Sequence, residues 1–146
     1  MKALTLWEPW ASLIAMKRKT AETRSWACPP DNYGRRIAIH AGRRVERELA
    51  AYFSVDPLPG YVVATAVLTQ CVRVESHTEG FAHCRTIRQN LITVPEDQYG
   101  DFSTGRWLWL LEDIAAVPEP FEAVGAQGLW PLSNGQIAEL HRQGVA

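Results

Sequence analysis

The chain is poor in cysteine and in long hydrophobic runs, and both shortages exclude classes of protein. Its three cysteines form an odd number with no pairing pattern, so we expect reduced thiols in a cytoplasmic protein. No apolar run approaches the roughly 20 residues that span a bilayer, and the first residues lack the features of a signal peptide. We therefore expect no membrane association.

Motifs for several common chemistries are also missing. The sequence contains no phosphate-binding loop, no dinucleotide-binding glycine pattern and no serine-hydrolase elbow. Cys71, His77, His83 and Cys84 match no zinc-ligand spacing, and there is no pair of cysteines separated by two residues. We therefore expect neither a bound metal nor a cofactor.

Charge is small in total but unevenly distributed. Ten basic and five acidic side chains give residues 1–50 a formal charge of +5, whereas five basic and eleven acidic side chains give the rest −6. This polarity is typical of an acidic body with one anion-binding surface. The alternative is a chance clustering of solvated charges.

Hydrophobic periodicity and turn residues predict several strands and two or three short helices. A helix is expected from Pro9 to about Arg18 or Lys19, with one face formed by Trp10, Leu13, Ile14 and the stem of Lys17. The other predicted elements are a short helix over 46–53 and extended segments over 2–6, 20–26, 36–41, 61–74 and 106–113.

The remaining regions are predicted from their irregular composition. The polar segment 75–99 has no clear period, so we expect a loop with a short helix around 85–91. Pro118 and Pro120 predict a loop after the last strand, and Ser133 is expected to cap a final helix over about 133–142. These elements predict one α+β domain over 1–146, a small mixed-strand β-barrel flanked by short helices.

The segment that follows the first helix holds the strongest candidate binding residues. Side chains alternate along an extended chain, so Glu22, Arg24 and Trp26 should lie on one side of it, close to Lys19. Charged groups are costly to bury unless they are paired, which favours a ligand-facing role. The alternatives are a structural ion pair between Lys19 and Glu22, or between Glu22 and Arg24.

Three further residues are candidates for the same surface. Arg106 follows small residues, and Ser103 could help to bind an oxyanion there, although Gly105 could equally just open a strand. His40 ends a buried strand, where a structural histidine and a cleft residue are both possible. Of the six tryptophans, Trp7 and Trp26 are the better candidates for stacking on an unpaired base.

Several blocks of this sequence resemble the ASCH domain family. They are Leu4–Ile14, Lys19–Arg24, Ile37–Ala41, Tyr99–Trp107 and Gly128–Trp130, so the resemblance covers about residues 2–132. It implies a PUA-like β-barrel with a cleft near the lysine-bearing helix, and an association with RNA or modified nucleotides. Relatives include proposed coactivator modules, enzymes that cleave RNA, and enzymes that remove an acyl group from a modified cytidine.

Two positions depart from the family pattern. Lys17 stands where the family commonly has glycine, and Glu22 stands where the deacylating branch has a catalytic threonine. The second departure weakens the transfer of that activity to this chain.

The sequence thus favours a nucleic-acid-binding module whose partner is RNA or another single-stranded nucleic acid. The predicted contacts are Lys19, Glu22, Arg24, Trp26, His40, Ser103 and Arg106. One alternative is a ribonuclease or an amidohydrolase acting on an acylated cytidine, with Lys19 and Glu22 as its catalytic residues. Another is a protein-interaction module that docks a partner through Val117–Trp130.

Overall fold

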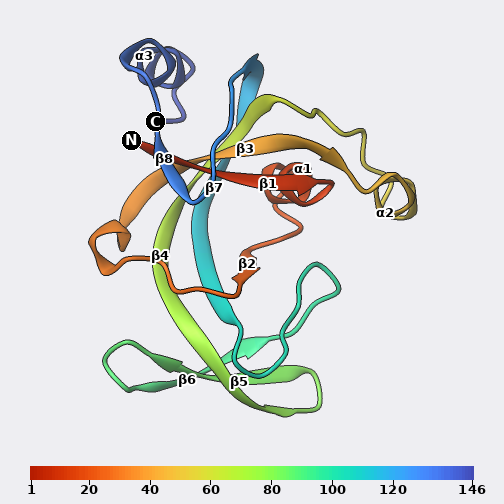
Figure 1. Cartoon of the computed structure of the whole chain (residues 1–146), viewed down its shortest axis with the longest axis vertical. Coiled ribbons are helices and arrows are strands. Elements are labelled where there is room, and N and C mark those ends of the chain that lie inside the picture. Colours follow the sequence, from red (N-terminus) through yellow and green to blue (C-terminus); the bar gives the residue numbers. More distant parts are fainter. The chain divides into compact units, whose positions relative to one another are not determined.

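The computed structural model describes all residues from Met1 to Ala146. Its elements are, in chain order, β1 (Lys2–Glu8), α1 (Trp10–Ala15), β2 (Ala21–Arg24), the 3₁₀ turn η1 (Pro30–Asn32), β3 (Arg35–Val45), α2 (Arg47–Tyr52), β4 (Tyr61–Thr78), β5 (Phe81–Thr86), β6 (Leu91–Pro95), β7 (Trp107–Glu122), β8 (Leu129–Pro131) and α3 (Asn134–Arg142) (Figure 1). The α+β class predicted from the sequence is confirmed. No helix is long and apolar enough to cross a membrane.

The strands form one hydrogen-bonded sheet that is open rather than closed. Its main path is β2-β7-β4-β3-β1-β8, with β5 paired to β4 and β6 paired to β5. The two end strands of the path, β2 and β8, are only four and three residues long, and each pairs with a single neighbour. The closed barrel expected from the sequence is therefore not confirmed.

The chain divides into two compact units, and the two longest strands contribute to both. The first unit comprises Met1–Lys19, Arg36–Val67 and Asp113–Ala146, and the second comprises Thr20–Arg35 and Leu68–Glu112. β4 and β7 pass from one unit to the other. The units are described separately below.

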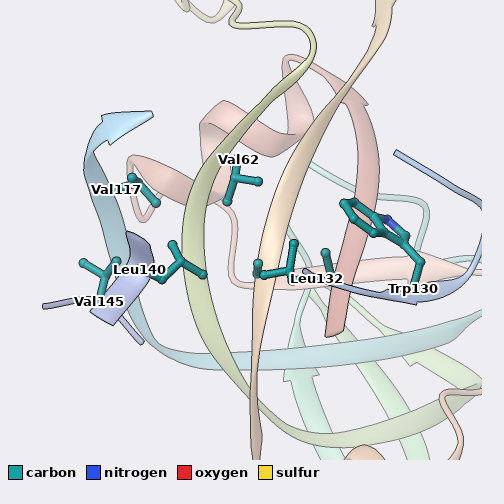
Figure 2. Packing of buried hydrophobic residues seen from close by; sticks show 8 residues of the cluster. Val62, Val117, Trp130, Leu132, Leu140 and Val145 are labelled. Carbon is teal, nitrogen blue, oxygen red and sulfur yellow. The ribbon is translucent and has the colours of Figure 1, made fainter. Parts of the chain in front are cut away.

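In the first unit, β1 pairs parallel with β3 and antiparallel with β8. Its hydrophobic core draws on strands and on the C-terminal segment, as Figure 2 shows for Val62, Val117, Trp130, Leu132, Leu140 and Val145. Ser133 caps α3 by accepting a hydrogen bond from the backbone of Gln136, whose side chain accepts one from the Ser133 N–H. Val117 and Trp130, the two ends of the segment predicted to dock a protein partner, are buried, whereas Val124 between them is exposed.

Helix α1 is shorter than the sequence predicts. Leu13 and Ile14 are fully buried, as expected of its apolar face, but the helix ends at Ala15. Lys17 has a φ of 61°, and the N–H groups of Arg18 and Lys19 both bond the carbonyl of Leu13. This turn removes Lys17 from the helical face and leaves its side chain exposed.

The segment 75–99 contains strands where the sequence predicted a loop and a short helix. β4 continues to Thr78, and the two antiparallel strands β5 and β6 follow it. The buried side chains alternate along these strands: Val72, Val74, Ala82, Cys84 and Val94. Sequence periodicity did not reveal this alternation, because some of these buried residues are small and because polar residues lie between them.

Strand β7 also extends further than predicted, through Pro118 and Pro120 to Glu122. Val117 beside the first proline is buried in the core, which holds the segment extended. Proline fits a strand wherever its position donates no ladder hydrogen bond.

Candidate nucleic-acid interface

Glu22 and Arg24 lie on the same face of β2, as the alternation of strand side chains predicts. The opposite face carries Ala21 and Thr23, which are buried. Arg24 Nε lies 3.4 Å from Glu22 Oε1, and both side chains are largely covered. The arginine is thereby held in one orientation on this face.

An aromatic ring lies close to the guanidinium of Arg24. Trp109 on β7 is the register partner of Glu22, and its ring centroid is 6.0 Å from Arg24 Cζ. Such a contact favours a planar cation over the ring face. Because Trp109 is fully buried, it can contact the arginine but offers no surface of its own to a ligand.

Trp26 packs against the same buried ring of Trp109. The two indoles meet edge to face, with centroids 4.7 Å apart and planes at 87°. Trp109 Nε1–H also donates a hydrogen bond of 3.2 Å to the carbonyl of Trp26. Trp26 keeps 36% of its surface exposed. It therefore presents a partly exposed aromatic ring that is packed against the same buried indole as Arg24.

Arg106 brings a second guanidinium to β2. Its Nη2 donates a 3.0 Å hydrogen bond to the carbonyl of Thr23, the residue directly before Arg24. Its Nε lies 3.7 Å from Asp101 Oδ2, which is ion-pair distance but too long for a hydrogen bond, and this Nε makes no hydrogen bond within the protein. Arg106 thus has one N–H that is buried and makes no hydrogen bond, beside the strand that carries Arg24.

Ser103 is engaged by an acidic neighbour that the sequence analysis missed. Its backbone N–H donates 2.9 Å to Asp101 Oδ1, and its hydroxyl donates to the same oxygen. These two bonds, together with the charge of Arg106, lower the pKa of Asp101 below its usual value. Gly105 has a φ of 90°, and its N–H bonds the carbonyl of Val74. The loop therefore already binds an anion of its own, a carboxylate.

The four charged groups of this surface cancel formally. Arg24 and Arg106 are matched by Glu22 and Asp101, all within the second unit. A carboxylate beside each of these two arginines reduces their attraction for a phosphate at long range. The arrangement suits one oriented nucleotide better than a length of phosphate backbone.

Lys19 belongs to the first unit, where it is buried. Its Nζ lies 5.6 Å from the ring centroid of Trp10, within the range of a cation–π contact. Its backbone N–H is bonded to Leu13, so the residue is fixed at the turn that follows α1.

His40 also belongs to the first unit and is held at both ring nitrogens. Nε2–H donates 2.9 Å to the carbonyl of Ala123, and Nδ1 accepts from the Thr5 hydroxyl at 3.1 Å. The same hydroxyl accepts from Trp130 Nε1–H at 3.0 Å. Burial lowers the pKa of His40, so the ring is neutral in this network. The neighbouring loop approaches so closely that a Cβ on Gly125 would lie 2.7 Å from the imidazole.

The geometry thus gathers Glu22, Arg24, Trp26, Ser103 and Arg106 within one unit, and sets Lys19 and His40 in the other. Trp109, Asp101 and Thr5 are the neighbours that sequence reasoning missed. Only Trp109 carried a signal, because the alternation of strand side chains places it on the same face as Trp107.

The fold is that of a small α+β protein in which a short strand with Arg24 at its end follows the first helix. Residues 4–124 match the ASCH domain family, and the chain belongs to that family. No curated protein shows significant sequence similarity to it.

Solved structures of an ASCH protein from Zymomonas mobilis share the fold. One is 21% identical, with a TM-score of 0.58, and the match covers 97% of this chain and 93% of that one. A tyrosine-to-phenylalanine mutant of that protein is 22% identical, with a TM-score of 0.59 and coverages of 97% and 96%. A serine-to-alanine mutant is also 22% identical, with a TM-score of 0.58 and coverages of 97% and 94%.

Proposed function

We propose that the chain is an RNA-binding module that holds an unpaired nucleotide on the β2–β7 surface. The observation that carries this proposal is the Trp109-centred cluster. One buried indole fixes the guanidinium of Arg24 and also the partly exposed ring of Trp26. A planar cation and an aromatic ring, both ordered in advance, suit a nucleotide's phosphate and base.

The residues have distinct roles in this proposal. Trp26 stacks on the base, and Arg24 and Arg106 donate hydrogen bonds to phosphate oxygens. Glu22 accepts a hydrogen bond from a base edge or from a ribose 2′-hydroxyl, which is the group that separates RNA from DNA. Ser103 is proposed as a further contact on this surface, and Lys19 and His40 are proposed as RNA contacts of the first unit.

The test is the salt-dependent affinity for a fluorescein-labelled single-stranded RNA. The double variant Arg24→Gln with Arg106→Gln should weaken binding at least about 10-fold. It should also reduce the slope of log K against log salt concentration by about 1.4, since each phosphate contact on a single strand contributes roughly 0.7. Arg35→Gln is the matched control. Arg35 belongs to the same unit and is exposed, and its side chain donates a hydrogen bond to the Asp31 carbonyl. Equal losses in the control and the double variant would refute the assignment.

Hydrolysis of RNA or of an acylated cytidine is a second candidate function, and the burial of Lys19 favours it. A lysine in a desolvated position can serve as a base or a nucleophile. Incubation with labelled RNA and with acyl-cytidine should then give products that Lys19→Arg abolishes. Equal product formation by the wild type and this variant would exclude the lysine from catalysis.

A further inference from the structure

A second aromatic–arginine pair belongs to the first unit and includes none of the residues of the proposed interface. Trp7, near the end of β1, is 47% exposed. Arg44 Cζ on β3 lies only 3.6 Å from the centroid of its ring, which is the separation of stacked planes. The Arg44 side chain is nevertheless 60% exposed. One face of the guanidinium is therefore covered by indole, and the other faces water.

The strand pairing holds this pair in place. β1 and β3 are parallel, with Leu6 opposite Ala41 and Glu8 opposite Val45. The register shifts between Leu6 and Glu8, which is where Trp7 lies. This irregularity sets the indole beside Arg44.

The backbone directly after Trp7 is anchored by a buried carboxylate. Glu8 accepts hydrogen bonds from the Ser12 N–H at 3.0 Å, from the Ser12 hydroxyl at 2.5 Å and from the Leu58 N–H at 2.9 Å. Three bonds to one buried group make this corner rigid. Arg44 is tethered as well, with Nη2 3.5 Å from Glu46 Oε1. Little conformational entropy remains to be lost when a ligand binds here.

The surrounding charge favours an anion. Residues 43–48 contain three arginines and two glutamates, and Arg43 and Arg47 are both exposed. This stretch has one more arginine than it has glutamates. A guanidinium stacked on an indole matches a base that is followed by its phosphate.

We propose that Trp7 and Arg44 form a stacking platform for an unpaired base of single-stranded RNA. The base lies on the water-facing side of the guanidinium, the indole supports that plane from below, and the N–H edge of Arg44 bonds a phosphate. This inference rests on the proposed RNA binding and adds a second contact point to it. If this stack on the guanidinium is worth as much as a base–aromatic stack, removing it costs about 5- to 150-fold in affinity.

The test compares three variants for binding to a fluorescein-labelled single-stranded RNA of about twelve nucleotides, a length within the site sizes of single-strand-binding domains. Trp7→Leu removes the support, and Arg44→Lys keeps the charge but removes the plane. Each should weaken binding within that range, and Arg44→Lys should leave the salt dependence unchanged. Tyr52→Leu is the control, because Tyr52 is an aromatic residue 75% exposed on α2, and its removal should change nothing. If Trp7→Leu fails to fold, Arg44→Lys decides.

The outcomes separate this inference from the proposed function. If the wild type binds RNA and both variants bind it equally well, the platform is refuted and the β2–β7 interface stands. Variants that keep full RNA binding but no longer bind a protein partner would also refute the platform. If the platform variants weaken binding and Arg24→Gln with Arg106→Gln does not, the platform stands and the main interface is wrong. If the wild type binds no RNA, both are overturned.

Discussion

Replacing Gly125 by alanine should destabilise the first unit, although glycine-to-alanine changes in loops are usually mild. Gly125 does not have a positive φ, so the cost is steric rather than conformational. A Cβ there would lie 2.7 Å from His40 Nδ1, His40 Cε1 and Thr5 Oγ1, far inside van der Waals contact. The obstacle is the hydrogen-bonded pair formed by these two side chains, and His40 is buried.

The magnitude follows from what must move. Overpacking a buried site costs about 1–3 kcal/mol. Breaking the bond between Thr5 and His40, which leaves a buried acceptor without its donor, costs about 1–3 kcal/mol more. Because the loop and the side chains can adjust in part, we expect a total loss of about 2–4 kcal/mol in the free energy of unfolding. For a chain of this length, that lowers Tm by about 6–12 °C.

Thermal unfolding followed by circular dichroism measures this effect. Gly135→Ala is the control, because Gly135 lies in α3 with only the Ser133 hydroxyl within 4 Å, at 3.9 Å, and alanine favours a helix. Its Tm should stay level or rise slightly. A Gly125→Ala variant that melts within about 1 °C of the wild type would mean that the loop yields freely, and would refute the close approach to His40.

Three further predictions concern other parts of the chain. Because burial lowers the pKa of His40, the unfolded chain binds a proton at this residue more readily than the folded chain does. The free energy of unfolding should therefore be level above about pH 7.5 and fall as the pH drops through about 6.5, with a slope of up to about 1.4 kcal/mol per pH unit. Ring resonances of His40 that titrate at or above about 6.5 in an NMR experiment would contradict this. Ser133→Ala removes the α3 cap and should cost about 1 kcal/mol in urea unfolding, whereas Ser133→Asp should retain most of the stability. Lys19→Met keeps the buried stem and should reduce the salt dependence of RNA binding by about 0.7 if Lys19 contacts a phosphate; an unchanged slope in a folded variant would remove it from the interface.

Local patterns predicted the elements that carry the interface. Residues close in sequence determine both the alternation of Glu22 and Arg24 and the strand that contains His40. Both features are present in the structure. The ASCH resemblance, read from short ordered blocks, is confirmed over residues 4–124. Where periodicity was strong, strand and helix types were correct.

Contacts between distant residues could not be predicted in the same way. The edge-to-face packing of Trp26 on Trp109 spans 83 residues, and the close approach of Gly125 to His40 spans 85. No period links such positions. The early end of α1 depends on a left-handed φ at Lys17, a conformation that lysine rarely adopts and that composition does not reveal.

The Nε–H resonances of Arg24 and Arg106 and the indole N–H resonance of Trp26 test the RNA interface most directly. In an NMR titration with single-stranded RNA, all three should shift in proportion to occupancy, while the Nε–H resonance of Arg35 should stay in place. Saturable RNA binding that leaves the first three resonances unmoved would contradict the proposed β2–β7 interface.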